Sequence, residues 1–348
     1  MADVYTLIEP AVITGIARTA IADEDRLINS FQLSRWFPRE FTYEIDYGYQ
    51  TGNDRTFSES ASFRAFDQPP RLGVRPGSTS VRGDLPPIGI EYLIREYDKI
   101  KLRTAGRQGD LAADLLPVVS ADVVRGVQAV ERRFEIFRRD LLIDGKAILS
   151  ESGLELEMDV QRNPARASTA LIGWDDPINA TMITDERNIM NTMLRGENIG
   201  SAEFVAVMNS VTWQAWLQGD QTRALWDSVR VVPRLTDSQG ASVRSAHGLP
   251  PVVLNDSQMR NPLTGLTEFI IPDYKVLYLP NFRIGATMYS VPSMADDPDI
   301  NLEYQERPGP LAYLTREIKP NNTSTVIDAL GAPLLQDPDA TYAFTAKP

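Results

Sequence analysis

The 348-residue chain is 43% hydrophobic and 24% charged, has a formal net charge of −12, and contains no cysteine and one histidine. This composition is that of a globular protein, and the missing cysteines exclude disulfides, thiolate metal sites and cysteine nucleophiles. The acidic balance argues against gripping nucleic-acid phosphates as the main task, since that needs clustered Lys and Arg. No run approaches the roughly 18 apolar residues of a membrane span, and the first residues lack the pattern of a signal peptide. We therefore expect a cytoplasmic product without a membrane segment.

Residues 1–45 are expected to form an N-terminal arm with patches of structure. Trp36 and Phe37 directly precede Pro38, which would end any helix that begins upstream. These aromatic side chains should be buried against either the body of the same chain or a neighbour.

Residues 46–90 are expected to form an extended loop. Short strands are predicted at 47–52 and 56–66, because aromatic residues such as Phe57, Phe63 and Phe66 favour strands. The stretch 68–89 contains five prolines and four glycines, which exclude regular helix. Its apolar residues favour a loop that docks on a partner over a free linker.

The clearest predicted helix covers about 119–148. Pro117 should block helix upstream, Ser120 is a candidate N-cap, and Gly145 is a natural stop. One apolar stripe recurs at spacings of three and four: Val123, Val127, Val130, Phe134, Phe137 and Leu141. Arginines mark the polar flanks of this helix: Arg125, Arg132, Arg133, Arg138 and Arg139. A long helix with one apolar stripe needs a sheet or another helix to cover it.

The remaining elements alternate between helix and strand. Strict alternation predicts a strand from Glu151 to Val160. Helices are predicted to open near Trp174, capped by Asp176, and to run from Ser201 to Gln218, ending at Gly219. Strands are predicted at 252–254, 268–271, 276–279, 283–289, 311–318 and 342–345, with a hairpin tip at 259–266. Helices followed by antiparallel strands suggest an α+β fold.

No catalytic, cofactor-binding or metal site is predicted, and no cofactor. His247 lies in a polar stretch without converging partners, so we interpret it as a solvated loop residue. The acidic run 294–300 lacks the glycine and later glutamate of a calcium loop and is interpreted as a surface loop. Asp175 and Asp176 are better explained by helix capping than as paired catalytic carboxylates.

The order of several short motifs resembles the lambda-type major capsid proteins (the phage major capsid protein E family). Leu156-Glu-Met-Asp-Val follows the long helix, and Trp174-Asp-Asp-Pro opens the next segment. Ile271-Pro-Asp-Tyr-Lys-Val-Leu-Tyr-Leu-Pro is similar to a strand of that family, and Gly331-Ala-Pro-Leu-Leu-Gln-Asp-Pro-Asp to its terminal motif. Together these motifs span nearly the whole chain.

The resemblance implies the HK-97-like capsid fold. Its parts would be an N-terminal arm at 1–45, an extended loop at 46–90, a peripheral domain at 91–174 with the spine helix at about 119–148, an axial domain at 175–310, and a return to the peripheral domain with a C-terminal tail at 311–348. It also implies a tailed-phage head protein that assembles in the host bacterial cytoplasm into hexamers and pentamers of an icosahedral shell enclosing DNA.

The implied partners are further copies of the chain, a separate scaffolding protein and a portal, with a decoration protein as a further candidate. DNA would be enclosed without specific binding, and no membrane is involved. Because the loop 46–90 contains no lysine, the lysine–asparagine cross-link of some relatives is not expected. The candidate inter-subunit contact residues are Trp36, Phe37, Phe57, Phe63, Phe66, Leu72, Val74, Arg75, Leu85 and Ile88.

Two other functions remain open at this point. One is an encapsulin-like compartment of the same fold, which would enclose a cargo enzyme. The other is a carboxylate-dependent hydrolase, such as a glycosidase, that uses Asp175, Asp176 or Glu186.

Overall fold

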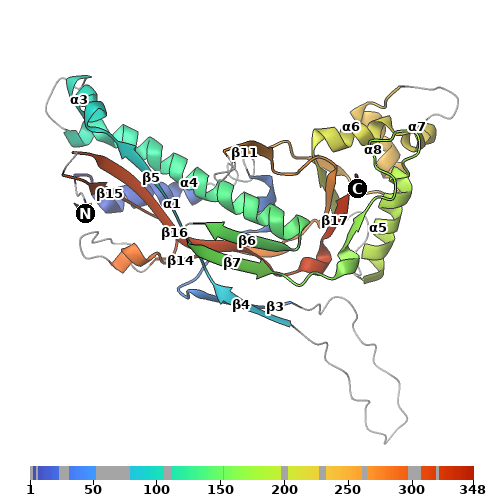
Figure 1. Cartoon of the computed structure of the whole chain (residues 1–348), viewed down its shortest axis with the longest axis horizontal. Helices are drawn as coiled ribbons and strands as arrows, with labels where there is room; N and C mark the ends of the chain where they lie inside the picture. The colour runs from blue at the N-terminus through green and yellow to red at the C-terminus, as the bar shows by residue number, and fades with distance from the viewer. Residues whose placement is uncertain are drawn as a thin grey trace, which may run out of the picture. The chain divides into compact units, whose positions relative to one another are not determined.

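The computed structural model contains both helices and strands (Figure 1). It describes residues 3–4, 7–22, 31–51, 79–105, 111–151, 153–196, 203–226, 233–260, 265–296, 307–318 and 321–348. The chain divides into two compact units. Unit 1 comprises Met1–Gly48, Arg82–Arg138 and Ala286–Leu334, and unit 2 comprises Tyr49–Val81, Arg139–Gly285 and Leu335–Pro348. The two units are thus interleaved along the chain. Among the described residues, no helix is both long enough and apolar enough to span a membrane.

Unit 1 is built on a six-stranded sheet with the order β1–β15–β16–β14–β2, in which β5 also pairs with β16. Its strands are β1 (Asp3–Val4), β2 (Arg39–Phe41), β5 (Pro87–Ile94), β14 (Gly285–Ser290), β15 (Leu311–Arg316) and β16 (Thr323–Leu335). Strand β16 pairs antiparallel with both β15 and β5. A Cβ at Gly331 would lie 2.4 Å from the backbone oxygen of Met288, so β16 and β14 approach closely only because this residue is glycine.

The helices of unit 1 supply the apolar cover that its sheet needs. They are α1 (Pro10–Ala22), α3 (Glu96–Ala105) and α4 (Leu111–Ile143), the last of which ends in unit 2. Ile13 and Ala17 of α1 pack in one buried cluster with Val123 and Val127 of α4 and Ile327 of β16. The predicted apolar stripe of the long helix is thereby confirmed as its buried face.

The predicted start of this helix is wrong. Helix α4 begins at Leu111 and contains Pro117, and Ser120 is no N-cap, since its hydroxyl donates to the backbone oxygen of Leu116 (2.7 Å). Proline removes only one helical hydrogen bond, and the fully buried Leu115 and Val119 continue the stripe upstream at spacings of four. Their burial offsets that loss. The helix ends at Ile143, before Gly145, which has a φ of 72°.

Unit 2 is built on a five-stranded sheet with the order β10–β9–β13–β17–β8. Its strands are β8 (Ala167–Thr169), β9 (Phe204–Met208), β10 (Val252–Leu254), β13 (Lys275–Pro280) and β17 (Tyr342–Thr345). Its helices are α5 (Met182–Gly196), α6 (Ser210–Gln218), α7 (Asp220–Trp226) and α8 (Asp237–Ala246). One core cluster joins Trp174, Trp213 and Trp216 to Val276 of β13 and Phe344 of β17.

Two helices predicted in unit 2 begin later than expected. Residues 204–208 form β9, and the helix starts at Ser210, where the Asn209 side chain accepts from the Thr212 N–H (2.9 Å); its predicted end at Gly219 is confirmed. A short apolar run that is buried on both faces fits either a strand or a helix. Helix α5 starts at Met182, because Asp176 caps only an isolated turn through the N–H groups of Ile178 and Asn179.

The strand predicted from Glu151 to Val160 is part of a hairpin. Strand β6 (Lys146–Glu151), which the prediction missed, pairs antiparallel with β7 (Leu154–Asp159) around Gly153, whose φ is 87°. A positive φ of this kind favours glycine and permits the tight reversal.

Two further strand pairs complete the sheets. Strands β3 (Asp46–Thr51) and β4 (Thr79–Asp84) pair at the ends of the predicted extended loop, whose predicted strand at 56–66 lies outside the described residues. Strands β11 (Gln258–Arg260) and β12 (Thr267–Phe269) pair around the predicted hairpin tip, so the partner of β12 is β11 and not the strand at 252–254. Single 3-10 turns occur at Gln32–Trp36, Pro164–Arg166, Ser293–Asp296 and Pro338–Ala340.

One half-buried carboxylate in the central strand of unit 1 makes stability depend on pH. Burial raises the pKa of Asp328 in β16, although a backbone hydrogen bond from Ala329 opposes this. When the pKa of a carboxyl is higher in the folded than in the unfolded chain, the folded state becomes less stable as the pH rises above the unfolded pKa, which is about 3.9 for Asp. We expect Asp328→Asn to raise the free energy of unfolding at pH 7 by less than about 1 kcal/mol, with no gain below about pH 4.

Urea denaturation of both chains at the two pH values measures this difference. The exposed Glu317→Gln serves as the control. A gain for Asp328→Asn that is equal at both pH values would contradict the explanation.

Candidate functional site

A buried charge cluster lies on helix α4 in unit 1. Glu131, Glu135 and Arg138 are at most 1% exposed, and their spacing places them on one face of the helix. Arg138 donates to Glu135 at 3.0 Å and to Glu131 at 3.3 Å. The sequence predicted Arg138 as part of a polar flank, and this prediction is wrong, because the side chain is buried between the two carboxylates.

The cluster binds two other segments of unit 1 to this helix. Arg39 Nε and the Tyr289 hydroxyl donate to Glu131 at 3.1 and 2.8 Å. The backbone N–H of Leu33 donates to Glu135 at 2.8 Å. The segment 31–41 and strand β14 are therefore held on α4 by charged hydrogen bonds, which are stronger than neutral ones.

The two carboxyls differ in their acidity. Burial raises the pKa of Glu131, but Arg138, Arg39 and the Tyr289 hydroxyl outweigh it and hold that pKa below its usual value. Burial raises the pKa of Glu135 in spite of Arg138. The side chains are closed to solvent and hydrogen-bonded to one another, although Arg138 Nε has no hydrogen-bond partner among the described residues. This arrangement is suited to holding segments together.

A second buried ion pair lies in unit 2. Arg244 donates to Glu186 (2.8 Å) and to the backbone oxygen of Pro250 (2.9 Å), and its guanidinium lies 5.2 Å from the ring centroid of Trp216. Burial raises the pKa of Glu186, although Arg244 opposes this. The pair fixes α8 to α5.

The three carboxylates proposed for a hydrolase each have a separate partner. Glu186 is enclosed with Arg244, Asp175 pairs with Lys347 (2.8 Å), and Asp176 accepts from Asn179 (2.7 Å) within its turn. The acid–base arrangement of a glycosidase requires two carboxyls that face one bond. These contacts do not form such a pair.

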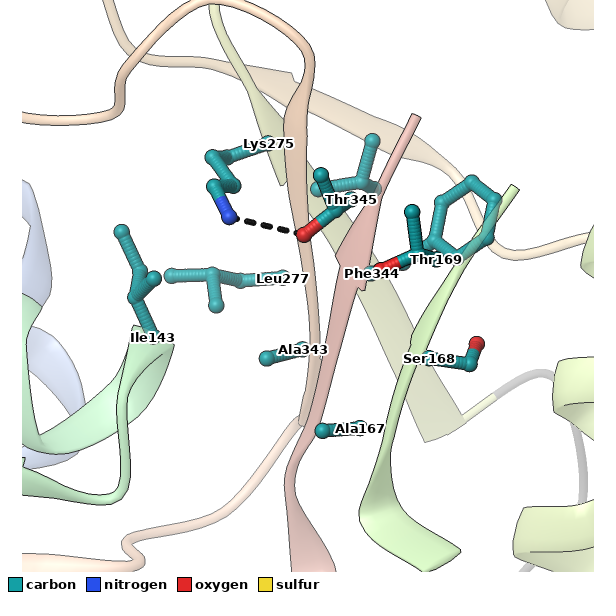
Figure 2. A pocket seen from close by; sticks show the side chains of 10 residues that line it. Ile143, Ala167, Ser168, Thr169, Lys275, Leu277, Ala343, Phe344 and Thr345 are labelled. Atoms are coloured by element: carbon teal, nitrogen blue, oxygen red, sulfur yellow. Dashed lines mark hydrogen bonds between the residues drawn. The ribbon is translucent and has the colours of Figure 1, made fainter. Parts of the chain in front are cut away.

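Two cavities among the described residues of unit 2 do not bring two carboxyls together. A cavity of about 170 Å³ lies over β8, β13 and β17, where Lys275 donates to Thr345 Oγ1 (2.7 Å) (Figure 2). Among the described residues that line it, Lys275 is the only ionisable one. A cavity of about 530 Å³ beside β10 contains Asp237, which already accepts from Trp213 Nε1 (3.0 Å).

No group of three or more His, Asp or Glu side chains that could hold a metal occurs in the part of the chain that the structure describes. His247 follows directly after α8, and its Nδ1 lies 2.8 Å from Arg187 Nη2. The acidic run 294–300 is described only as far as residue 296.

The sequence-predicted contact residues fall into three groups. Trp36, Phe37 and Leu85 are buried by the chain itself, so packing within one chain already covers them. Ile88 packs partly buried against the core of unit 1. The others lie outside the described residues: Phe57, Phe63, Phe66, Leu72, Val74 and Arg75.

Several exposed apolar side chains were missed by the sequence analysis. Phe41, Tyr43 and Ile45 are each more than half exposed, as is Ile148 on the β6–β7 hairpin, and Leu171 is 93% exposed. The alternation Phe-Thr-Tyr-Glu-Ile was a usable signal for apolar residues outside the core, but β2 ends at Phe41, so no strand aligns the three side chains on one face. Large exposed apolar residues indicate a surface for a partner only where they gather together.

No family model and no curated protein matches the chain, whereas solved structures do. The chain is similar to an Escherichia coli prophage protein described as a capsid protein, with 13% identity and a TM-score of 0.56 over 90% of this chain and 92% of that one. It is similar to a phage-related protein from Bordetella bronchiseptica, with 11% identity and a TM-score of 0.54 over 99% and 98%. It is also similar to a subunit of the mature capsid of bacteriophage PhiM1, with 9% identity and a TM-score of 0.50 over 90% and 86%.

The fold is therefore an α+β fold shared with phage capsid proteins over 90% of this chain. It is the HK-97-like fold, as the resemblance in sequence implied.

Proposed function

We propose that this chain is the major capsid protein of a tailed bacteriophage and that many copies of it assemble into the shell of the virion. The observation that carries the proposal is the shared fold, which covers 90% of this chain and 92% of a prophage protein described as a capsid protein. The proposed role is structural, and a self-assembling shell needs no catalytic groups that converge on a substrate.

The finer parts of the proposal concern assembly and partners. Copies would form hexamers and pentamers of an icosahedral shell in the cytoplasm of the host bacterium, around DNA that they do not bind specifically. A separate scaffolding protein, a portal and a decoration protein are the proposed partners. Closed point-group symmetry requires each copy to present complementary surfaces to its neighbours.

The segments of the chain keep their proposed places in this shell. Residues 1–45 would be the arm, 46–90 the extended loop, 91–174 the peripheral domain, 175–310 the axial domain, and 311–348 the return and tail. Of the proposed contact residues, those between 57 and 75 are the ones on which the inter-subunit role depends, since Trp36, Phe37 and Leu85 are already buried.

Sedimentation velocity of the purified chain over a range of concentrations tests assembly. We expect large, discrete particles above a threshold concentration, because repeated interfaces make assembly cooperative. A chain that sediments as a monomer at every concentration, with and without its scaffolding protein, would contradict the proposal. The content of particles from the native host separates the two shell functions, since DNA supports a phage head and a packaged enzyme supports an encapsulin-like compartment.

A further inference from the structure

The β6–β7 hairpin of unit 2 has one partly buried face and one exposed face. The two strands pair so that Lys146, Ile148 and Ser150 lie opposite Asp159, Glu157 and Glu155. Side chains alternate across a strand, so these six share the outer face. All six are exposed, whereas Ala147 and Met158 on the inner face are 1% and 2% exposed.

The outer face combines an apolar centre with a negative surround. Ile148 is 59% exposed and lies directly opposite Glu157. Lys146 reaches Glu157 only at 3.8 Å, and both side chains remain about half exposed. One lysine against three carboxylates leaves this face with a net charge of −2. Ile148 is thus an exposed apolar side chain among carboxylates. A complementary surface would carry positive charges around a small residue, which leaves room for the isoleucine.

Helix α4 presents a stripe of that kind within unit 1. Ala121, Arg125, Ala129 and Arg132 follow one another at spacings of four, four and three, so they lie along one face of the helix. Ala121, Arg125 and Arg132 are exposed and Ala129 is partly so. The Arg125 side chain is 69% exposed and donates to the largely buried Asp122 carboxylate at 3.3 Å.

The two surfaces also match in dimensions. Arg125 and Arg132 are separated by about 10 Å along the helix axis, at 1.5 Å per residue. Glu155 and Asp159 are separated by about 13 Å along β7. Long arginine side chains can span this difference, and Ala129 leaves room for Ile148 between them.

We propose that the outer face of the β6–β7 hairpin docks on this stripe of α4 in a second copy of the chain. The inference rests on the proposed function, because it assigns one of the contacts between shell subunits. Each surface lies within one unit, so the match does not depend on how the two units are arranged. Ile148 packs on Ala129, and the carboxylates of β7 pair with Arg125 and Arg132.

Charge reversal tests this contact. One variant carries Glu155→Arg and Asp159→Arg, a second carries Arg125→Glu and Arg132→Glu, and a third carries all four changes. Sedimentation velocity gives the threshold concentration for assembly of each. Like charges across an interface are costly, so we expect the first two variants to raise the threshold at least about tenfold. The third variant restores opposite charges and should return to within about threefold of wild type.

The remaining outcomes distinguish failure of the proposed contact from failure of the proposed function. Glu317→Arg reverses an exposed charge elsewhere and should leave the threshold unchanged, and circular dichroism confirms that each variant is folded. If all variants assemble like wild type, or if the combined variant is not rescued while Glu317→Arg assembles, the contact is overturned and the shell function stands. Loss in only one of the two reversals shows that the surfaces bind different partners and also overturns it. If wild type never assembles, the proposed function fails and this contact with it.

Discussion

Replacing Arg138 by methionine is expected to lower the free energy of unfolding by about 3–5 kcal/mol, the cost of breaking a buried ion pair by removing one partner. Glu131 and Glu135 would stay buried, and only Arg39 would remain to balance their charges. Methionine keeps much of the volume of arginine, so the loss reports charge more than packing. Urea denaturation followed by far-ultraviolet circular dichroism measures it.

The pH dependence of this variant gives an independent check. Without Arg138, burial should raise the pKa of Glu135 further above its unfolded value of about 4.3, because its charged form is left without a cationic partner. The pKa of Glu131 should rise as well, because only Arg39 and the Tyr289 hydroxyl would still oppose burial there. A raised folded pKa costs stability as the pH rises through it, so the deficit of Arg138→Met should be largest at pH 7 and shrink toward pH 4.

Arg132→Met is the matched control, because Arg132 lies on the exposed face of the same helix. We expect a change within about 0.5 kcal/mol for this exposed position. Equal losses for the two variants would contradict the role assigned to the buried cluster.

Replacing Trp174 by alanine is expected to lower the free energy of unfolding by about 3–5 kcal/mol, the range for deleting a buried aromatic side chain. Trp174 is 1% exposed, packs 5.4 Å from the ring centroid of Phe344, and donates from Nε1 to Asp185 at 3.2 Å. It therefore joins strand β17 to the start of α5 in unit 2. The alanine variant would leave a cavity and remove one hydrogen bond of the Asp185 carboxylate, which keeps the bond from the Thr181 hydroxyl (3.1 Å).

Two further variants separate the causes. Trp174→Phe keeps most of the packing and loses the hydrogen bond, so it should cost about 1–2 kcal/mol. Trp226→Ala removes a tryptophan that is 42% exposed and should cost less than about 0.5 kcal/mol. Denaturation followed by circular dichroism measures all three, and a loss for Trp226→Ala equal to that for Trp174→Ala would contradict this explanation.

The sequence predicted well those elements whose signal is local. The stripe from Val123 to Leu141 specifies the long helix, and Gly219 marks the end of α6 correctly, because amphipathic periodicity and caps are encoded within a few turns. The helix start at Leu111 was not predicted, because Pro117 normally ends a helix, whereas here the buried stripe continues through Leu115 and Val119.

Elements that depend on distant partners were missed or mistaken. Strand β16 was missed, because it contains Pro333, which is uncommon inside a central strand. Its pairing with β5, which lies more than 200 residues earlier in the chain, and with β15 cannot be read from the local pattern. Phe204–Met208 was assigned to a helix, although it is a strand buried between β10 and β13. In the buried cluster, the helical pattern could not show that Arg138 lies inward, since Arg39 and Tyr289 come from far along the chain.

Electron microscopy of negatively stained, purified chain tests the central claim most directly. The chain would be imaged after expression alone and after expression with its candidate scaffolding protein. The proposed shell function predicts closed shells or rings of capsomers in at least one of the two samples. Dispersed monomers in both would contradict it.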